Sequence, residues 1–296
     1  MITLGTITAA QMAAVYRNLN TLFMQGFNGP PVDWNKIATL SPSTTSEELY
    51  AWVGSFPQMV EWFGDRTIQN LAAHGYIIKN RDFEVTLALK RNDVLDNKLG
   101  MYNMPFVQLG ESARTHPDSL VFALLAAGFD TICYDGQYFI DDDHPVGSTT
   151  ASNDGGGSGT AWYLLDTRHY IKPIIFQQRQ TPQFVAMDQV TDESVFMRKE
   201  FLYGVDDRKN VGYGFWQMIY GSKQTLDADS YEAGRAAMRG QVNDKGTPLN
   251  FMPNLLVVPP SLEGRGLEIL RAASLAAGGT NIWQGTAELL VSSYLS

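Results

Sequence analysis

The stretch "RDFEVTLALKR", residues 81–91, alternates between apolar and polar side chains. Successive side chains of an extended chain point to opposite faces, so this period of two predicts a half-buried strand. The apolar positions are Phe83, Val85, Leu87 and Leu89. The preceding residues 52–63 are also strand-like, which predicts a long ribbon tipped by residues 64–75. A two-stranded ribbon is marginal in water, so its apolar face needs a further surface, and another subunit can supply it.

Two helices are predicted around this ribbon. Residues 103–129, "NMPFVQLGESARTHPDSLVFALLAAGF", carry the longest helical pattern of apolar positions. Pro117 lacks an N–H and clashes with the preceding turn, so a kink or a restart is expected there. Upstream, residues 8–24 predict a helix that Thr8 caps and Gly26 ends, followed by Pro-rich extended chain. This N-terminal part is typical of an arm laid across another surface.

The rest of the chain mixes strands and helices. Aromatic and β-branched residues in 162–179 and 194–223 predict strands separated by turns. Residues 227–242 and 261–278 have helical patterns, with a short buried strand, "NLLVVPP", at 254–260. The segment 141–160 between the two halves is predicted as coil. Together these elements indicate an α+β fold.

Composition limits the classes of function. The 296 residues include 22 Lys and Arg against 31 Asp and Glu, a formal charge of −9. This balance repels phosphate backbones and argues against direct nucleic-acid binding, although a protein that encloses DNA is still allowed. The single cysteine, Cys133, has no intrachain disulfide partner, which favours a reducing cytosol. The longest apolar stretch, residues 120–129, is about half of the roughly 20 residues that cross a bilayer.

The sequence offers few catalytic patterns. Asp141, Asp142, Asp143 and His144 are consecutive, and neighbouring side chains on an extended chain cannot all converge on one ion. A solvated turn before Pro145 is the better interpretation. The glycine run "DGGGSGT" lacks the lysine and hydroxyl of a phosphate loop, and the four histidines form no metal-binding pair. No catalytic site, metal or cofactor is therefore expected.

Longer motifs resemble the Mu-like phage major head subunit family. The resemblance is carried by "VEWFGDRTIQNLAAHGYIIKNRDFEVTLALKR", "CYDGQYFIDDDHP", "WYLLDTRHYIKPIIFQQR", "EFLYGVDDRKNVGYGFWQMIYGSK", "PNLLVVPPSLEGRGLEIL" and "NIWQGTAELLVSSYL". These segments cover most of residues 50–296, in the order of the family. None of the short pieces is sufficient alone, but their combination is specific.

The resemblance implies the Hong Kong 97-type phage capsid fold. The expected parts are an N-terminal arm (1–50), an E-loop (51–92), a P-domain (93–222) with its spine helix at 103–129, and an A-domain (223–296). In the fold's type member the A-domain helices precede the last P-domain strands, whereas here the helix, strand and helix of 225–296 come last. The boundary near 222 is the point at which this chain departs from the expected order.

The resemblance also implies a structural role. Hexamers and pentamers of the chain would form an icosahedral shell around double-stranded DNA, without sequence-specific binding and without a membrane. Scaffold, portal and decoration proteins are the expected partners, and the virion, assembled in the bacterial host cytoplasm, is the expected location. The residues expected to contact a neighbouring subunit are Arg66, Phe83, Val85, Leu87, Leu89, Lys90 and Arg91, joined by Lys79 and Arg81. Replacing Leu87 and Leu89 with Asp is then predicted to leave a folded but unassembled protein.

Two other functions stay open from the residues alone. One is a metal-dependent hydrolase that uses Asp141, Asp143 and His144. The other is a storage nanocompartment with the same shell fold, which needs a cargo-docking groove that the sequence does not identify. Images of purified particles distinguish a shell from a soluble enzyme.

Overall fold

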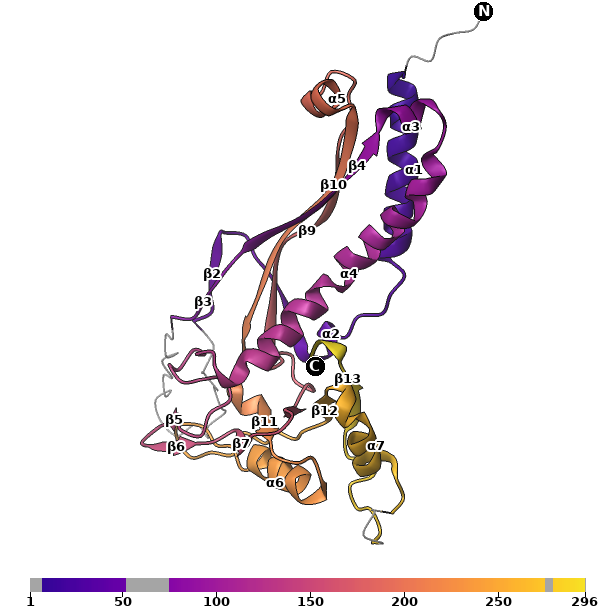
Figure 1. The fold of residues 1–296 in the computed structure, drawn as a ribbon. Coiled ribbons are helices and arrows are strands. Elements are labelled where there is room, and N and C mark those ends of the chain that lie inside the picture. Colours follow the sequence, from indigo (N-terminus) through magenta and orange to yellow (C-terminus); the bar gives the residue numbers. More distant parts are fainter. Residues whose placement is uncertain (1–6, 52–74, 275–278, 296) are drawn as a thin grey trace, which may run out of the picture. The chain divides into compact units, whose positions relative to one another are not determined.

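The computed structural model describes residues 7–51, 75–274 and 279–295 (Figure 1). The chain divides into two compact units, each assembled from three segments. Unit 1 comprises residues 1–33, 80–118 and 178–210, and unit 2 comprises residues 34–79, 119–177 and 211–296. Both helices and sheets are present, as the α+β prediction requires.

The elements are as follows. The α-helices are α1 (Ala9–Phe27), α2 (Trp34–Ile37), α3 (Arg91–Leu95), α4 (Asn103–Ala126), α5 (Glu193–Arg198), α6 (Ala228–Arg239) and α7 (Glu263–Arg271). The strands are β1 (Ala38–Pro42), β2 (Glu47–Leu49), β3 (Ile77–Lys79), β4 (Arg81–Lys90), β5 (His144–Val146), β6 (Thr149–Ala151), β7 (Asp154–Gly157), β8 (Trp162–Leu165), β9 (Ile174–Met187), β10 (Glu200–Tyr213), β11 (Ile219–Lys223), β12 (Leu255–Val258) and β13 (Glu288–Val291). Short 3₁₀ turns lie at Leu99–Tyr102, Ala127–Phe129, Trp216–Met218, Pro260–Leu262 and Ser293–Leu295.

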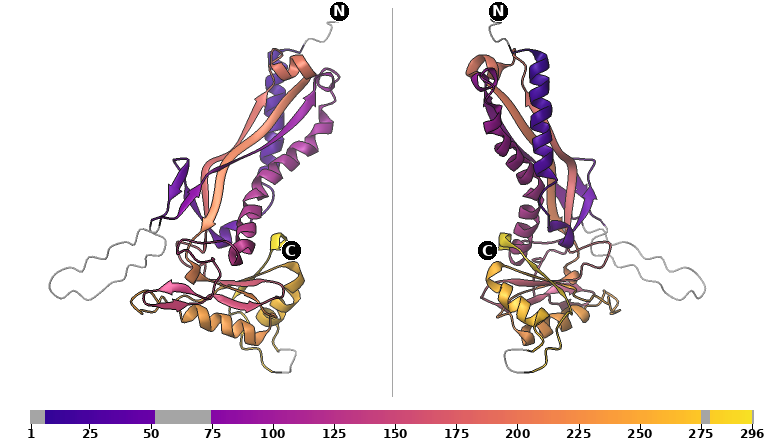
Figure 2. Two further views of the ribbon diagram at one scale, coloured as in Figure 1. Left: turned by 60° about the vertical axis from the view of Figure 1, so that its left-hand side comes forward. Right: turned by 90° about the vertical axis from the view of Figure 1, so that its right-hand side faces the viewer.

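In unit 1, α1 packs closely against α4 (Figure 2). The predicted cap is present, because the Thr8 hydroxyl accepts from the Gln11 backbone N–H and the Gln11 side chain accepts from the Thr8 N–H. Gly26 has a different role from the predicted helix end. It lies inside α1, where a Cβ would be 1.9 Å from the Val107 carbonyl oxygen, so only glycine permits this approach.

The helix predicted at 103–129 is confirmed as α4 with the following 3₁₀ turn. It continues through Pro117, so no second helix starts there. The first part of α4 belongs to unit 1, where Phe106 and Leu109 are buried beside α1 and β10 residues.

The strand predicted at 81–91 is also confirmed, as β4. Residues 52–63, the predicted other half of the ribbon, lie outside the described residues. Strand β4 pairs antiparallel with β10, in register from Lys90 opposite Glu200 to Arg81 opposite Lys209. Within the described chain it forms the edge of a four-stranded sheet of order β1-β9-β10-β4. The alternating strand is therefore part of a sheet within its own subunit.

Unit 2 is built on a five-stranded sheet of order β13-β12-β8-β11-β7. Strands β8 and β12 are buried at every position, because both faces of the sheet are covered. Trp162, Leu164 and Leu256 face a cluster with α6 and α7 residues, whereas Tyr163 and Leu165 face the other core. The 254–260 prediction is thus confirmed, and α6 lies beside the sheet in Figure 1.

This sheet includes strands from both sides of the boundary expected near residue 222. Strands β8 and β11, which were assigned with the P-domain, share a sheet and a core with β12 and β13 from the C-terminal segment. The order of the strands along the chain did not reveal this, because β8 pairs with both β11 and β12 across 54 to 94 residues of sequence.

Two short antiparallel strand pairs also belong to unit 2. Strands β2 and β3 pair with Glu47 opposite Lys79, and β5 and β6 pair with His144 opposite Ala151. With β7, the β5–β6 pair replaces much of the coil predicted for residues 141–160. Among the described residues, no helix has the length and apolar character needed to span a membrane.

Candidate inter-subunit surface

The apolar face of β4 changes character along the strand. Leu89 is completely buried, and Leu87 is half-buried against the same core cluster, which includes Leu19, Phe106 and Phe201. The intervening residues Glu84, Thr86 and Ala88 are exposed. Leu89 therefore packs within its own subunit, and its side chain is not available to a neighbour in this conformation. We therefore expect Leu89→Asp to prevent folding of the subunit, and not only its assembly.

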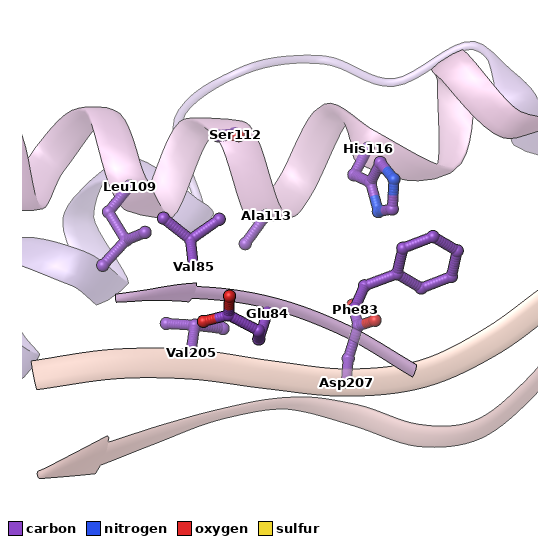
Figure 3. A pocket seen from close by; sticks show the side chains of 9 residues that line it. All are labelled: Phe83, Glu84, Val85, Leu109, Ser112, Ala113, His116, Val205 and Asp207. Carbon is purple, nitrogen blue, oxygen red and sulfur yellow. The ribbon is translucent and has the colours of Figure 1, made fainter. Parts of the chain in front are cut away.

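The other half of this face borders a small pocket of about 150 Å³ (Figure 3). Its lining comes from β4, α4 and β10, all in unit 1, and consists of Phe83, Glu84, Val85, Leu109, Ser112, Ala113, His116, Val205 and Asp207. Val85 lies opposite Val205 in the sheet and is 46% exposed. Leu109, Ala113 and His116 point from the helix towards the strand in Figure 3. The result is an open, mostly apolar recess.

Three basic or titratable side chains surround the Phe83 ring. The His116 ring meets it edge-on at 4.5 Å between centroids. Arg81 Cζ and Lys209 Nζ lie 5.3 and 5.7 Å from its centroid, within the range of a cation–π contact. These contacts hold the ring in place at one end of the pocket.

A buried ion pair lies beneath this ring. The Lys209 ammonium is fully buried and donates to Asp207 Oδ2. Burial lowers the pKa of Lys209, and the bond to Asp207 opposes that change. Asp207 Oδ1 is buried and has no hydrogen-bond donor within the described chain. The pKa of His116 is lowered by burial and by Lys209, which favours a neutral imidazole at the pocket wall.

The remaining predicted contact residues lie apart from the pocket. Lys90 is exposed at the end of β4, and the Arg91 backbone N–H donates to the Lys199 carbonyl at 2.8 Å. Lys79, in unit 2, lies 3.9 Å from Glu47. Arg66 lies outside the described residues. The predicted contact residues on β4 therefore do not form a single surface patch. Phe83, Val85, Leu87 and Leu89 share one face of the strand, whereas Lys90 and Arg91 lie at its end.

Sequence reasoning missed the pocket residues on α4 and β10. Asp206 and Asp207 are turn-forming residues within the stretch 194–223, where turns between strands are predicted, but both lie inside β10. The available signal was the alternation of Val205, Asp207 and Lys209 on one face of the strand. The contribution of His116 and Leu109 depends on how α4 crosses the sheet, which no local pattern encodes.

The loop proposed for a metal-dependent hydrolase does not bring its three residues together. The side chains of Asp142 and Asp143 are exposed, and the carboxylates of Asp141 and Asp143 accept local hydrogen bonds, as the turn interpretation predicts. The carboxylates of Asp141, Asp142 and Asp143 do lie within 4.8 Å of one another, so the expectation that they cannot converge is wrong, but His144 is not part of that group. His144, in contrast, is fully buried and contacts Asp135 and Asn153. The solvated position predicted for His144 is therefore wrong, because β5 carries its ring into the core of unit 2.

Comparisons with known proteins agree on one family. The model of the family "Mu-like prophage major head subunit gpT" matches residues 12–295. The major capsid protein of Escherichia phage Mu is 39% identical, over 98% of this chain and 99% of its own length. The Mu-like prophage FluMu major head subunit of Haemophilus influenzae is 38% identical, over 94% of each chain.

Solved structures give the same result. A chain from the procapsid of bacteriophage JBD30 is 41% identical, with a TM-score of 0.86, covering 97% of this chain and 100% of that chain. A chain from the JBD30 capsid is 31% identical, with a TM-score of 0.80, covering 99% of this chain and 100% of that chain. The fold is therefore the Hong Kong 97-type capsid fold. The chain belongs to the Mu-like prophage major head subunit gpT family.

Proposed function

We propose that copies of this chain assemble into the icosahedral shell of a Mu-like phage or prophage head, which encloses double-stranded DNA. The observation that carries this proposal is the likeness to the procapsid chain, at 41% identity and a TM-score of 0.86 over 97% of the chain. A shell subunit acts through repeated contacts between copies, so the proposed role includes no catalysis.

The proposed assembly has several kinds of contact. Copies of the chain form hexamers and pentamers, and scaffold and portal proteins act during assembly in the host cytoplasm. The JBD30 capsid decorated with minor capsid protein trimers provides a chain 32% identical to this one, covering 90% of this chain and 92% of that chain. By analogy, we propose a decoration protein on the virion of this phage as well.

The acidic composition suits a container for DNA. At a formal charge of −9 the chain offers little positive charge to retain phosphate backbones. A genome inside such a shell stays mobile enough to be packaged and released.

We further propose a revised assignment of the parts. The spine helix is α4, and the sheet of β7, β8, β11, β12 and β13 with α6 and α7 forms the A-domain. The E-loop is joined to the rest of the chain through the β2–β3 pair. We therefore place the E-loop, with this pair as its base, within residues 47–79 rather than at 51–92. This revision is supported by the pairing of β4 with β10, which makes residues 81–90 part of the P-domain sheet.

Of the contact residues expected from the sequence, Phe83 and Val85 are the ones we retain as a surface for a neighbouring subunit. Val85 is nearly half exposed at an apolar recess, so covering it by another copy removes apolar surface from water. We propose that Lys90, exposed at the end of β4, forms ion pairs with acidic side chains of the neighbouring subunit at the edge of this interface.

Val85→Asp is predicted to block assembly while leaving the subunit folded. Its carboxylate stays in water in the free subunit, but an unpaired charge covered at an interface costs several kcal/mol. The expected result is a loss of particles of roughly tenfold or more, with unchanged circular dichroism. Electron microscopy and size-exclusion chromatography measure the particle yield, and circular dichroism measures the fold of the subunit.

Ala88→Asp is the matched control, since it places the same charge on the exposed, opposite face of the same strand. Normal particle yield from Val85→Asp would contradict the assignment of this surface. Equal losses of particles from Val85→Asp and Ala88→Asp would show that the Val85 face of β4 is not a specific contact surface.

The shell function itself is tested by expressing the chain and imaging it. Shells, rings or tubes are expected at high protein concentration. A compact monomer with turnover of a small molecule would overturn the proposal, and closed shells loaded with protein cargo would indicate a nanocompartment instead.

A further inference from the structure

Helix α5 presents two large apolar side chains to solvent. It lies in unit 1, in the connection between β9 and β10 (Figure 1). Val195 is buried in the unit 1 core, whereas the next two side chains, Phe196 and Met197, are 83% and 68% exposed. Backbone bonds close the turn, since the Lys199 N–H donates to the Val195 carbonyl at 3.1 Å. The core contact therefore holds the exposed pair outward on a fixed support.

An open groove of about 770 Å³ lies in the same unit, between α1 and the residues that follow β9. Tyr16 fixes one wall to the other, because its hydroxyl donates to the Phe184 carbonyl at 3.1 Å. Ala13, Val185 and Val190 line the groove and are exposed. The volume is in the range of cavities that hold drug-sized ligands, so large side chains can enter it.

The apolar side chains of α5 and of the groove form one concentration of exposed apolar surface. Val185, Met187, Val190, Phe196 and Met197 are all at least 42% exposed, and all lie within residues 185–197. Exposed apolar side chains are ordinary when they are scattered, whereas such a concentration marks an interaction surface.

The charges on α5 and in the groove are complementary. Glu193 and Arg198 lie in the first and last turns of α5, and both are exposed. Arg17 and Asp188 line the groove. None of these four side chains forms an ion pair in the part of the chain that the structure describes. Each charge on the helix therefore has an opposite charge available in the groove.

From these features we infer that α5 of one copy enters the groove of a neighbouring copy. Phe196 and Met197 pack on the groove walls, while Glu193 pairs with Arg17 and Arg198 pairs with Asp188. This inference rests on the proposed shell function and names one of its contacts.

A second copy is the partner because each chain carries both the projecting helix and the groove. Phe196 does not fill the groove of its own chain, since most of its surface is exposed. Each copy can therefore give one contact and receive one, and such head-to-tail contacts close into a ring when the rotation between copies permits it.

Cysteine cross-linking between two variants tests this contact directly. The one natural cysteine, Cys133, is buried, so introduced thiols react selectively. Ala13→Cys subunits are mixed with Met197→Cys subunits before assembly and oxidised mildly. Disulfide-linked dimers with one copy of each variant are expected by gel electrophoresis and mass spectrometry. Ala88→Cys, exposed on β4, replaces Ala13→Cys as the control and should give none.

Particles from the mixture that lack this cross-link would overturn the contact but leave the shell function intact. A cross-link from Met197→Cys to another virion protein would also overturn it. If the unaltered chain forms no particles, the shell function is contradicted. The same cross-link at high subunit concentration then decides the contact.

Phe196→Ser should reduce particle yield roughly tenfold or more, because an apolar side chain that fills a groove contributes much of the contact affinity. Circular dichroism should not change, since the side chain is mostly exposed in the free subunit. Phe196→Met keeps an apolar side chain and should keep most of the yield. A normal yield from Phe196→Ser would contradict the proposal.

Reversal of one charge pair tests the orientation of the helix in the groove. Arg17→Glu and Glu193→Arg should each reduce particle yield, about tenfold, because a like-charge pair replaces an attractive one in every repeated contact. The double variant restores opposite charges and should recover the yield. Losses that simply add in the double variant would contradict this pairing.

Discussion

Leu89→Asp is expected to prevent folding of the subunit, and not merely its assembly. The leucine side chain is completely buried in the unit 1 cluster with Met12, Phe106 and Phe201. An ionised carboxylate at this position loses its hydration and gains no cationic partner there, at a cost of about 3–5 kcal/mol or more. This is a large part of the roughly 5–15 kcal/mol that stabilise a typical domain.

The measurement is the soluble yield of the variant and the urea midpoint of any soluble protein. Leu89→Met is the control, because a swap of similar volume usually costs less than about 1.5 kcal/mol. If Leu89→Asp were soluble with an unchanged midpoint but failed to form particles, Leu89 would be an interface residue, as the sequence suggested. Val85→Asp, four residues away on the same face, then separates assembly from folding.

Gly110→Ala is expected to destabilise unit 1 by about 3 kcal/mol, at the upper end of overpacking effects. An added Cβ would lie 2.1 Å from the Phe23 carbonyl oxygen and 2.6 Å from the Phe27 nitrogen, both backbone atoms of α1. Backbone cannot yield as a flexible side chain does, so α1 and α4 must move apart. Gly26, on the facing helix, makes the reciprocal approach to the Val107 carbonyl.

Gly264→Ala in α7 is the matched control, since nothing lies within 4 Å of its added Cβ. In that helix, alanine is expected to stabilise by up to about 1 kcal/mol. Opposite signs in the two unfolding midpoints would confirm that close helix packing, not helix propensity, requires Gly110. An unchanged midpoint for Gly110→Ala would contradict the α1–α4 contact.

Much of the local structure follows from short-range pattern. The period of two in residues 81–90 and the helical period in 103–129 specify β4 and α4, because a half-buried element must present its apolar side chains to one side. The Thr8–Gln11 capping box similarly marks the start of α1. These predictions needed no knowledge of distant residues.

For the coil predicted at 141–160, the local sequence pattern gave the wrong prediction of burial. Turn-forming residues in "DDDHPVGSTTASNDGGGSGT" indicated a solvated loop, yet His144 and Asn153 are buried there. Their polar atoms are satisfied by Asp135, Phe139 and Trp216, and such partners compensate the cost of burying polar groups. No pattern within the loop itself names those partners.

The sequence alone thus determined the type and approximate extent of α1, β4 and α4, and through longer motifs the family, since periodicity and caps depend on near neighbours. It did not determine that the helix predicted at 261–278 ends at Arg271, or that Glu193–Arg198 forms a helix within a stretch predicted as strands. Tertiary structure alone decided that β4 pairs with β10, that Leu89 faces its own core while Val85 faces outward, and that His144 meets Asp135. The physical reason is that a side chain's environment is set by whichever element packs over it. That choice depends on the combined burial of segments far apart in the chain.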